Sequence, residues 1–264
     1  MKRYLVIFSS ILLCAASCAK VTVIEDAPAE EDLIGFSWYA QRPVGAMSTK
    51  ADMDYYVDSG HLVGGKSFGV FGYFHPQYEE GGTTHAGGWQ DRVNHNHPNL
   101  FFNQEVTITE DDGAYSYDYD HEDYRYWPRN SFDRVSFIAY YPWNDGVANG
   151  TPTEDTRVEP VLDTQYERDG MVAFYYTVPD DASEQVDFLV SDLDIDQSKA
   201  APNLTGDGKV KFFFHHALSQ VRINRITTDN GGNDDLDIQV RKIVFEKVAV
   251  FGRCVPEPDF TNPG

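Results

Sequence analysis

Residues Gly60 to Ser67, with the sequence GHLVGGKS, match the pattern G-x-x-x-x-G-K-S of a phosphate-binding loop. In such a loop the backbone amides and the lysine hold the phosphates of a nucleotide, and the serine hydroxyl binds Mg²⁺. This chemistry requires a buried strand before the loop and a helix after it, because the N-terminus of the helix faces the phosphates. The pattern therefore predicts a nucleotide site only in that structural context.

Histidines provide a second candidate site. His95 and His97 lie on the same side of an extended segment, with His85 and His121 as candidate partners, and such spacing is typical of zinc ligands. A polar loop explains the same residues, because Pro98 and the neighbouring asparagines indicate irregular chain. We favour the loop and expect no metal here.

Alternating carboxylates provide a third candidate site. Asp192, Asp194 and Asp196 would project from one face of a strand and could form part of a calcium site. Solvated loops remain the simpler interpretation. The sequence contains no G-x-S-x-G or H-E-x-x-H pattern and no Cys/His nucleophile arrangement, and nothing singles out a pair among its 42 acidic residues. We therefore expect neither an enzyme nor a cofactor.

The N-terminus carries an export signal. Lys2 and Arg3 precede a short apolar run, which is followed by small residues and Cys18. This order is typical of a secretory signal, and the apolar run is too short to span a membrane. The sequence AASC resembles a bacterial lipobox, so we predict lipid attachment at Cys18. Cys14 leaves with the signal, and Cys254 then remains alone, which excludes a disulfide within one mature chain.

Charge excludes one class of partner. The formal net charge is -21, from 42 acidic and 21 basic residues, and loss of Lys2 and Arg3 with the signal makes it -21 - 2 = -23. Binding of nucleic acid requires cations that neutralise phosphates, so we expect no nucleic-acid partner.

The residues after Lys66 predict a strand rather than a helix. In SFGVFGYF, aromatic, branched and glycine residues alternate with period two between Phe68 and Tyr73. Such a stretch fits a pleated strand and makes a poor helix. An exported protein would also meet little ATP. We therefore interpret GHLVGGKS as the start of a strand and expect no nucleotide site.

The rest of the chain predicts an all-β fold. Short alternating segments are separated by clusters of Gly, Asn and Asp, which favours a β-sandwich. A short helix is expected at most near 217–219 or within 164–169. The predicted strands cover 34–40, 67–74, 105–109, 115–119, 134–141, 171–178, 185–190, 209–214, 220–226 and 236–250, the last with an interruption.

Four segments stand in a characteristic order: FGVFGYF (68–74), YWPRNSFDRVSFIAYYP (126–142), YYTVPDDASEQVDFLVSD (175–192) and VKFFFHHALSQVRI (210–223). This set resembles the fimbrillin family, fimbrial lipoproteins of anaerobic Gram-negative bacteria. The resemblance implies a transthyretin-like β-sandwich, usually with a second one in tandem, and no enzymatic activity. Within it, packing explains His215 and His216 better than catalysis does.

The resemblance also gives a domain plan. We expect a lipoprotein signal peptide (1–17), an acidic tether (18–33), an N-terminal β-sandwich (34–255) and a tail or the start of a second domain (256–264). Since the chain stops at Gly264, the second sandwich is expected to be absent or truncated.

Function follows from the same resemblance. It implies an outer membrane lipoprotein at the cell surface or in the fimbrium, a structural subunit or membrane-proximal anchor involved in adhesion. The expected partners are other fimbrial subunits, joined by strand addition, and the outer membrane through the lipid. Host or bacterial surface ligands are further candidates. The alternative is a surface glycan-binding lipoprotein, in which Trp89, Trp143 and Tyr117 stack on sugars. Aromatic residues in alternating strands more often belong to the core.

Proteolytic removal of the N-terminal strand would distinguish a subunit of the fimbrial shaft from a membrane anchor. In fimbrillins the N-terminal strand of a shaft subunit can be removed by a trypsin-like protease, and a neighbour's strand fills the opened groove by β-addition. Here that strand is LIGFSWYA (33–40). Arg42 precedes Pro43 and is a poor cleavage site, so Lys50 is the candidate processing site. We favour an accessory or anchor role, because an Arg-specific protease finds only the blocked site.

Replacement of Cys18 by Ala should release the protein from the membrane fraction. Acyl chains contribute about 0.8 kcal/mol per buried CH₂, so loss of the acylated cysteine removes the anchor. Fractionation followed by immunoblotting measures the effect. A variant that stays bound after a high-salt wash would show that the anchor lies elsewhere.

Overall fold

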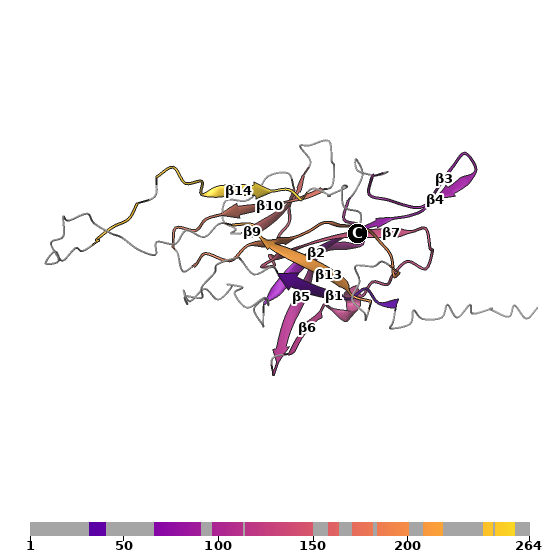
Figure 1. The fold of residues 1–264 in the computed structure, drawn as a ribbon, viewed down its shortest axis with the longest axis horizontal. Helices are drawn as coiled ribbons and strands as arrows, with labels where there is room; N and C mark the ends of the chain where they lie inside the picture. The colour runs from indigo at the N-terminus through magenta and orange to yellow at the C-terminus, as the bar shows by residue number, and fades with distance from the viewer. Residues whose placement is uncertain are drawn as a thin grey trace, which may run out of the picture.

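A computed structural model describes residues 32–40, 66–90, 97–112, 114–149, 158–163, 171–181, 184–200, 208–218, 240–244 and 246–256. These ranges form strands and the short 3₁₀ turn η3 (His121–Asp123), with no α-helix among them. Figure 1 shows the strands gathered in one body, from which the hairpin β3–β4 projects. The predicted all-β fold is confirmed. Within these ranges no helix has the length and apolarity needed to cross a bilayer.

The larger sheet contains the N-terminal strand at one edge. Neighbouring strands in this sheet pair antiparallel, except β1 and β13, which pair parallel. In spatial order its strands are β1 (Phe36–Ala40), β13 (Val210–His216), β11 (Leu189–Ser191), β7 (Arg134–Tyr141), β2 (Ser67–His75), β5 (Phe101–Asp111) and β6 (Ala114–Asp118), and β12 (Asp194–Gln197) also pairs with β7.

A smaller sheet covers one face of the larger one. In spatial order it runs β14 (Phe251–Cys254), β10 (Met171–Thr177), β9 (Val158–Asp163) and β8 (Ala148–Asn149). The projecting hairpin consists of β3 (Tyr78–Glu80) and β4 (Thr83–His85).

Strands β2 and β7 are buried on both faces. Alternate residues of β2 point to opposite sides, so Phe68 and Val70 join one apolar core while Phe71 and Tyr73 join another. The first core lies inside the curl of the larger sheet, and the second lies between the two sheets. Strands buried on both faces are dense in apolar residues, which explains the aromatic run in this part of the sequence.

Glycines in β2 make room for aromatic rings. A Cβ on Gly69 would lie 2.2 Å from the Tyr140 ring, and one on Gly72 would lie 2.7 Å from the Phe101 ring. Since β2 begins at Ser67, directly after Lys66, a strand stands where a phosphate-binding loop needs a helix. Residues 60–65 of that pattern lie outside the described residues.

The C-terminal part of the sequence gave the least accurate strand predictions. Of the segment predicted at 236–250, the described residues 240–244 and 246–250 form no strand, and pairing begins only at β14. The bond from Val178 N–H to Val250 O, at 2.8 Å, continues the ladder between β10 and β14 by one residue, and the described residues before Val250 form no strand.

Two other predictions near β13 need correction. Only 189–191 form a strand around the predicted 185–190. Ala217 N–H donates to Phe188 O at 2.8 Å instead of starting a helix, and the described residues 217 and 218 are not helical. The predicted strand 220–226 and the candidate helix 164–169 lie outside the described residues.

Two histidine–aspartate pairs brace the end of β13. His216 Nδ1 lies 2.8 Å from Asp187 Oδ1, and both side chains are largely buried. His215 Nε2 lies 2.9 Å from Asp192 Oδ1 on the exposed side. The hydrogen bond to Asp187 raises the pKa of His216 above its usual value of 6.5, although burial opposes the shift.

The stability of the fold should therefore fall as the pH rises through the raised pKa of His216. The protonated imidazole stabilises the folded state fully below the unfolded pKa, and this contribution disappears above the folded pKa. Urea unfolding at a series of pH values from about 6.5 upward follows that change, because an unperturbed histidine has a pKa near 6.5. The variant His216→Gln should flatten the profile. His215→Gln, whose pair is exposed and screened, is the matched control; an equal effect in both variants would contradict the assignment.

Candidate functional site

Among the described residues, strand β1 forms a ladder along one side only. It forms a parallel ladder with β13, in which Phe36 is opposite Val210 and Trp38 is opposite Phe212. On its other side, side chains replace a ladder: Tyr119 OH donates to Ile34 O at 2.7 Å, and Trp38 Nε1 donates to Tyr117 OH. The two edges of the larger sheet are therefore held together by tyrosine hydroxyls at the end of β6.

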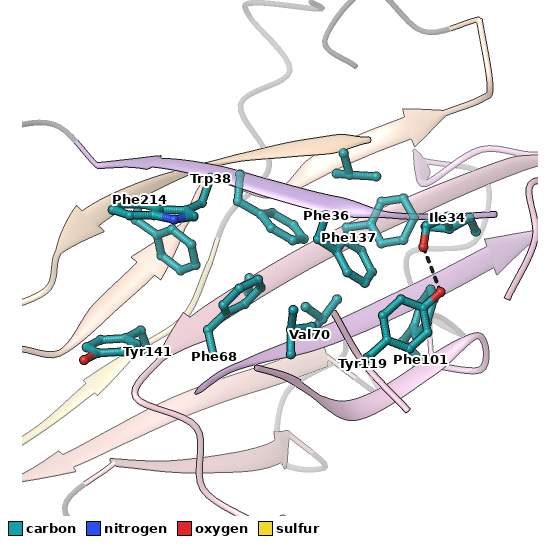
Figure 2. Packing of buried hydrophobic residues seen from close by; sticks show 14 of the residues in the cluster. Ile34, Phe36, Trp38, Phe68, Val70, Phe101, Tyr119, Phe137, Tyr141 and Phe214 are labelled. Atoms are coloured by element: carbon teal, nitrogen blue, oxygen red, sulfur yellow. Dashed lines mark hydrogen bonds between the residues drawn. The ribbon is translucent and has the colours of Figure 1, made fainter. Parts of the chain in front are cut away.

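Phe36 lies at the centre of this closure. Its ring centroid is 5.4 Å from Phe101, 5.6 Å from Tyr119, 6.1 Å from Phe137 and 5.6 Å from Phe212. Figure 2 shows Ile34, Phe36 and Trp38 of this segment pointing into the same core. Aromatic pairs at these separations add to the stabilisation from burial alone. The Phe36 side chain thus connects β1 to β5, β7 and β13 and to Tyr119, the residue after β6.

The segment before β1 is held by backbone bonds. Ile34 N–H donates to Arg125 O at 2.9 Å, and Trp127 N–H donates to Asp32 O at 2.8 Å. Gly35 allows a close approach, because a Cβ there would lie 2.9 Å from Lys209 Cγ. An ion pair between Asp32 and Lys199 lies on the exposed side. Residues 32–38 therefore form one extended segment that spans the core.

Removal of this segment would open an apolar groove. Ile34, Phe36 and Trp38 are 0%, 1% and 8% exposed, so each fills a pocket in the core. Without them, the rings of Phe68, Phe212 and Phe214 would meet water and one edge of β13 would lose its partner. Any extended chain with three bulky apolar residues at positions i, i+2 and i+4 has the chemistry to refill such a groove.

The residues singled out for modification cannot be placed. Cys18, Arg42 and Lys50 lie outside the described residues, as does the segment between β1 and Lys66. Lipid attachment at Cys18 and processing at Lys50 remain predictions, and so do the domain boundaries.

The aromatic residues expected for sugar stacking are not exposed platforms. Trp89 is 1% exposed and packs edge-on against Tyr73, with ring centroids 5.0 Å apart. Trp143 is half-buried and donates its Nε1–H to Asn103 O at 3.2 Å. Tyr117 is half-buried against the core and accepts the bond from Trp38. Trp89 and Trp143 lie outside the strands, so tertiary contacts rather than alternation along a strand decide their packing.

The histidines do not converge. His85 stacks on Tyr78 with ring centroids 5.2 Å apart, and His121 packs at a tilt against Tyr124 with centroids 4.6 Å apart. His97 is exposed on a separate segment, and His95 lies outside the described residues. No group of three metal-ligating side chains exists within the described ranges.

The three alternating aspartates also separate. Asp192 pairs with His215, whereas Asp196 Oδ1 accepts a hydrogen bond from Trp89 N–H at 2.7 Å. Asp196 has a φ of 54°, in the left-handed region, so the strand does not keep the regular alternation that the sequence suggested.

Sequence reasoning missed Tyr117 and Tyr119 as the residues that hold β1. Their signal was present in YSYDY (115–119), where tyrosines alternate along a short strand. Alternation places these tyrosines on the face of β6 that meets the core, and a buried tyrosine hydroxyl requires a hydrogen-bond partner. Which partner it finds depends on how the sheet curls.

Comparison with known proteins identifies the family. Residues 57–254, more than half of the chain, match the model of the fimbrillin-like family. The chain belongs to that family. A curated relative is the fimbrium subunit Fim1C of Phocaeicola vulgatus, which is 23% identical to this fimbrillin-like chain over 224 residues. The match covers 84% of this chain and 51% of the relative, so the chain spans about half the length of the curated relative it matches.

Two solved structures are similar to parts of this fimbrillin-like chain. A fimbrial protein from Bacteroides vulgatus is 18% identical with a TM-score of 0.41, covering 70% of this chain and 45% of that one. A putative cell adhesion protein from Bacteroides uniformis is 14% identical with a TM-score of 0.33, covering 72% and 49%.

Replacement of Phe36 by Ala should reduce the free energy of unfolding by about 3–5 kcal/mol, the usual range for a buried phenylalanine. The cavity would lie where β1, β5, β7 and β13 meet Tyr119, the residue after β6. Phe132→Ala is the control, because that side chain is 45% exposed and should change stability by about 0.5 kcal/mol or less. Urea unfolding followed by tryptophan fluorescence measures both. Equal losses would contradict the central position of Phe36.

Proposed function

We propose that this fimbrillin-like protein is a non-catalytic structural component of cell-surface fimbriae, which joins its neighbours by exchange of β1 for a neighbour's strand. The observation that carries the proposal is the position of β1. It is the first described strand, lies at a sheet edge and forms a ladder with one strand only among the described residues. It nevertheless supplies the core side chains of Phe36 and Trp38, and Ile34 just before it supplies a third.

The energetics of β1 support exchange. A strand that leaves breaks one ladder and a few side-chain bonds, while every other ladder of the sheet stays intact. The exposed groove then has both unpaired backbone groups and apolar pockets, which favours capture of another strand. A tightly packed edge strand can therefore fill the groove of its own subunit and still be replaced by a neighbour's strand.

The linker after β1 controls whether exchange can begin. The chain runs from Ala40, the last residue of β1, to Ser67, the first of β2, and the candidate site Lys50 lies between them. A cut there would separate β1 and the lipid-bearing N-terminus from the fold. An uncut chain would keep its lipid and act as an outer membrane anchor or accessory subunit, and a cut chain could enter a shaft.

We favour the anchor or accessory role. In the linker, Arg42 is followed by Pro43, so an Arg-specific protease meets a blocked bond. The alternative function, sugar binding by stacked rings, receives no support from Trp89, which is buried, or from Trp143 and Tyr117, which are half-buried and held by hydrogen bonds to Asn103 O and Trp38 Nε1.

An Arg-specific protease should leave the folded protein uncut between β1 and β2 and monomeric. Electrophoresis and N-terminal sequencing after brief digestion measure this, with trypsin as a parallel treatment. Clean trypsin cleavage after Lys50 accompanied by growing ladders would contradict the anchor role and support a shaft subunit. A protease-resistant monomer supports the anchor.

The variant Pro43→Ala tests exchange itself. It unblocks Arg42, so the Arg-specific protease should now release β1 and ladders should grow with protein concentration. Arg42→Gln/Pro43→Ala is the matched control and should stay monomeric. A Pro43→Ala protein that is cut cleanly but never assembles would overturn strand exchange.

A further inference from the structure

The three side chains that fill the groove under β1 do not make the same kind of contact. Ile34 and Phe36 are buried in the first core and offer only apolar surface to it. Trp38 is buried in the same core, but its indole N–H also donates to Tyr117 OH. The first two positions therefore depend on size and apolarity, whereas the third also depends on a hydrogen-bond donor.

Aromatic rings surround the third position. The Trp38 ring lies edge-on to Phe214, with centroids 6.3 Å apart, and edge-on to Tyr117 at 6.4 Å. Figure 2 shows Trp38 beside Phe214 in this core. Tyr117 is held in turn by Phe68, with ring centroids 6.3 Å apart. The hydroxyl of Tyr117 is thus fixed where the indole nitrogen of a buried tryptophan reaches it.

Tyr117 depends on Trp38 for its own hydrogen bond. Its side chain is half-buried, and within the described ranges Trp38 is the one hydrogen-bond partner of its hydroxyl. Burial raises the pKa of the Tyr117 hydroxyl above its usual value, and the bond from Trp38 opposes that shift. A partly desolvated hydroxyl that loses its partner destabilises the complex in which it sits.

The other end of the groove recognises only the backbone. Tyr119 OH donates to the main-chain oxygen of Ile34 at 2.7 Å, and Val210 N–H donates to Gly35 O at 2.9 Å. Every strand carries such oxygens, so these bonds do not depend on side chains. The two ends of the groove therefore differ, and only a strand that runs parallel to β13, as β1 does, places its third apolar side chain at Tyr117.

We propose that Tyr117 selects the strand that replaces β1. The groove favours an incoming strand that runs parallel to β13 and carries an aromatic ring with a hydrogen-bond donor, such as tryptophan, at the position of Trp38. This inference rests on the proposed exchange of β1 and specifies the chemistry of the partner strand. A ring of the same size without a donor fills the third position but leaves Tyr117 OH unpaired. A neutral hydrogen bond of this kind corresponds to about a five- to tenfold difference in affinity.

Labelled peptides test this selection by fluorescence anisotropy. The Pro43→Ala protein, cut after Arg42 by the Arg-specific protease, is offered a peptide of residues 32–40. A second peptide replaces Trp38 by benzothienylalanine, which keeps the shape of tryptophan with sulfur in place of the N–H, and should bind about five- to tenfold more weakly. A third peptide, Ile34→Trp/Trp38→Ile, has the native composition with the indole at the wrong end and should also bind more weakly.

Variants of the protein assign the difference to one hydroxyl. The Tyr117→Phe protein should bind the tryptophan and benzothienylalanine peptides with affinities within about twofold of each other, because neither can form the bond. Tyr119→Phe is the matched control, since its hydroxyl contacts the main chain of Ile34; it should weaken both peptides and preserve their ratio. Equal binding of both peptides to the Tyr117 protein would overturn the selection and leave strand exchange intact. Failure of every peptide to bind would overturn strand exchange, and the selection with it.

A double-mutant cycle in the uncut protein gives a measurement that does not require exchange. Urea unfolding followed by circular dichroism compares Trp38→Phe, Tyr117→Phe and the variant that carries both. The double variant should lose less stability than the sum of the two single losses, by a factor of about five to ten in the unfolding equilibrium constant. Additive losses would show that Tyr117 and Trp38 are not coupled and would overturn the proposal, whether or not strands exchange.

Discussion

The closure of the larger sheet by Phe36 is the contact on which the rest of the structure depends. The Phe36 ring contacts aromatic residues that are far apart in the sequence, and the two edges of the sheet come together around it. Burial of a phenylalanine side chain stabilises a fold by roughly 1.5–3 kcal/mol relative to its exposure, and truncation adds the penalty of a cavity. The first described strand thus completes a core built mostly by later strands.

This arrangement links stability to assembly. Strand β1 contributes large side chains to the core but only one ladder, so its binding energy comes mainly from burial rather than from backbone pairing. Burial is less demanding of sequence than a specific polar contact, because pockets of this kind accept any bulky apolar residue of suitable size. A neighbour's strand can therefore satisfy the same groove without reproducing the sequence of β1.

Much of the fold could be predicted because the relevant signals are local. The nearly continuous apolar runs in 67–74 and 134–141 determine β2 and β7 almost to the residue, since strands buried on both faces need apolar side chains on both faces. The segment 236–250 looked equally strand-like, yet its described residues do not pair. Alternating apolar residues indicate that a segment can form a strand. Pairing also requires a free edge of a sheet beside that segment.

The sequence alone determined the all-β class, the family resemblance and the strand after Lys66 that argues against a nucleotide site; the export signal before Cys18 stays a prediction from the same sequence. These follow from composition, short motifs and period-two alternation, which act over a few residues. Only the tertiary structure decided that β1 pairs parallel with β13, that Tyr117 and Tyr119 hold its other side, and that Trp89 and Trp143 pack inward. Each of those contacts joins residues tens of positions apart, and the curl of the sheet that brings them together is a property of all its strands at once.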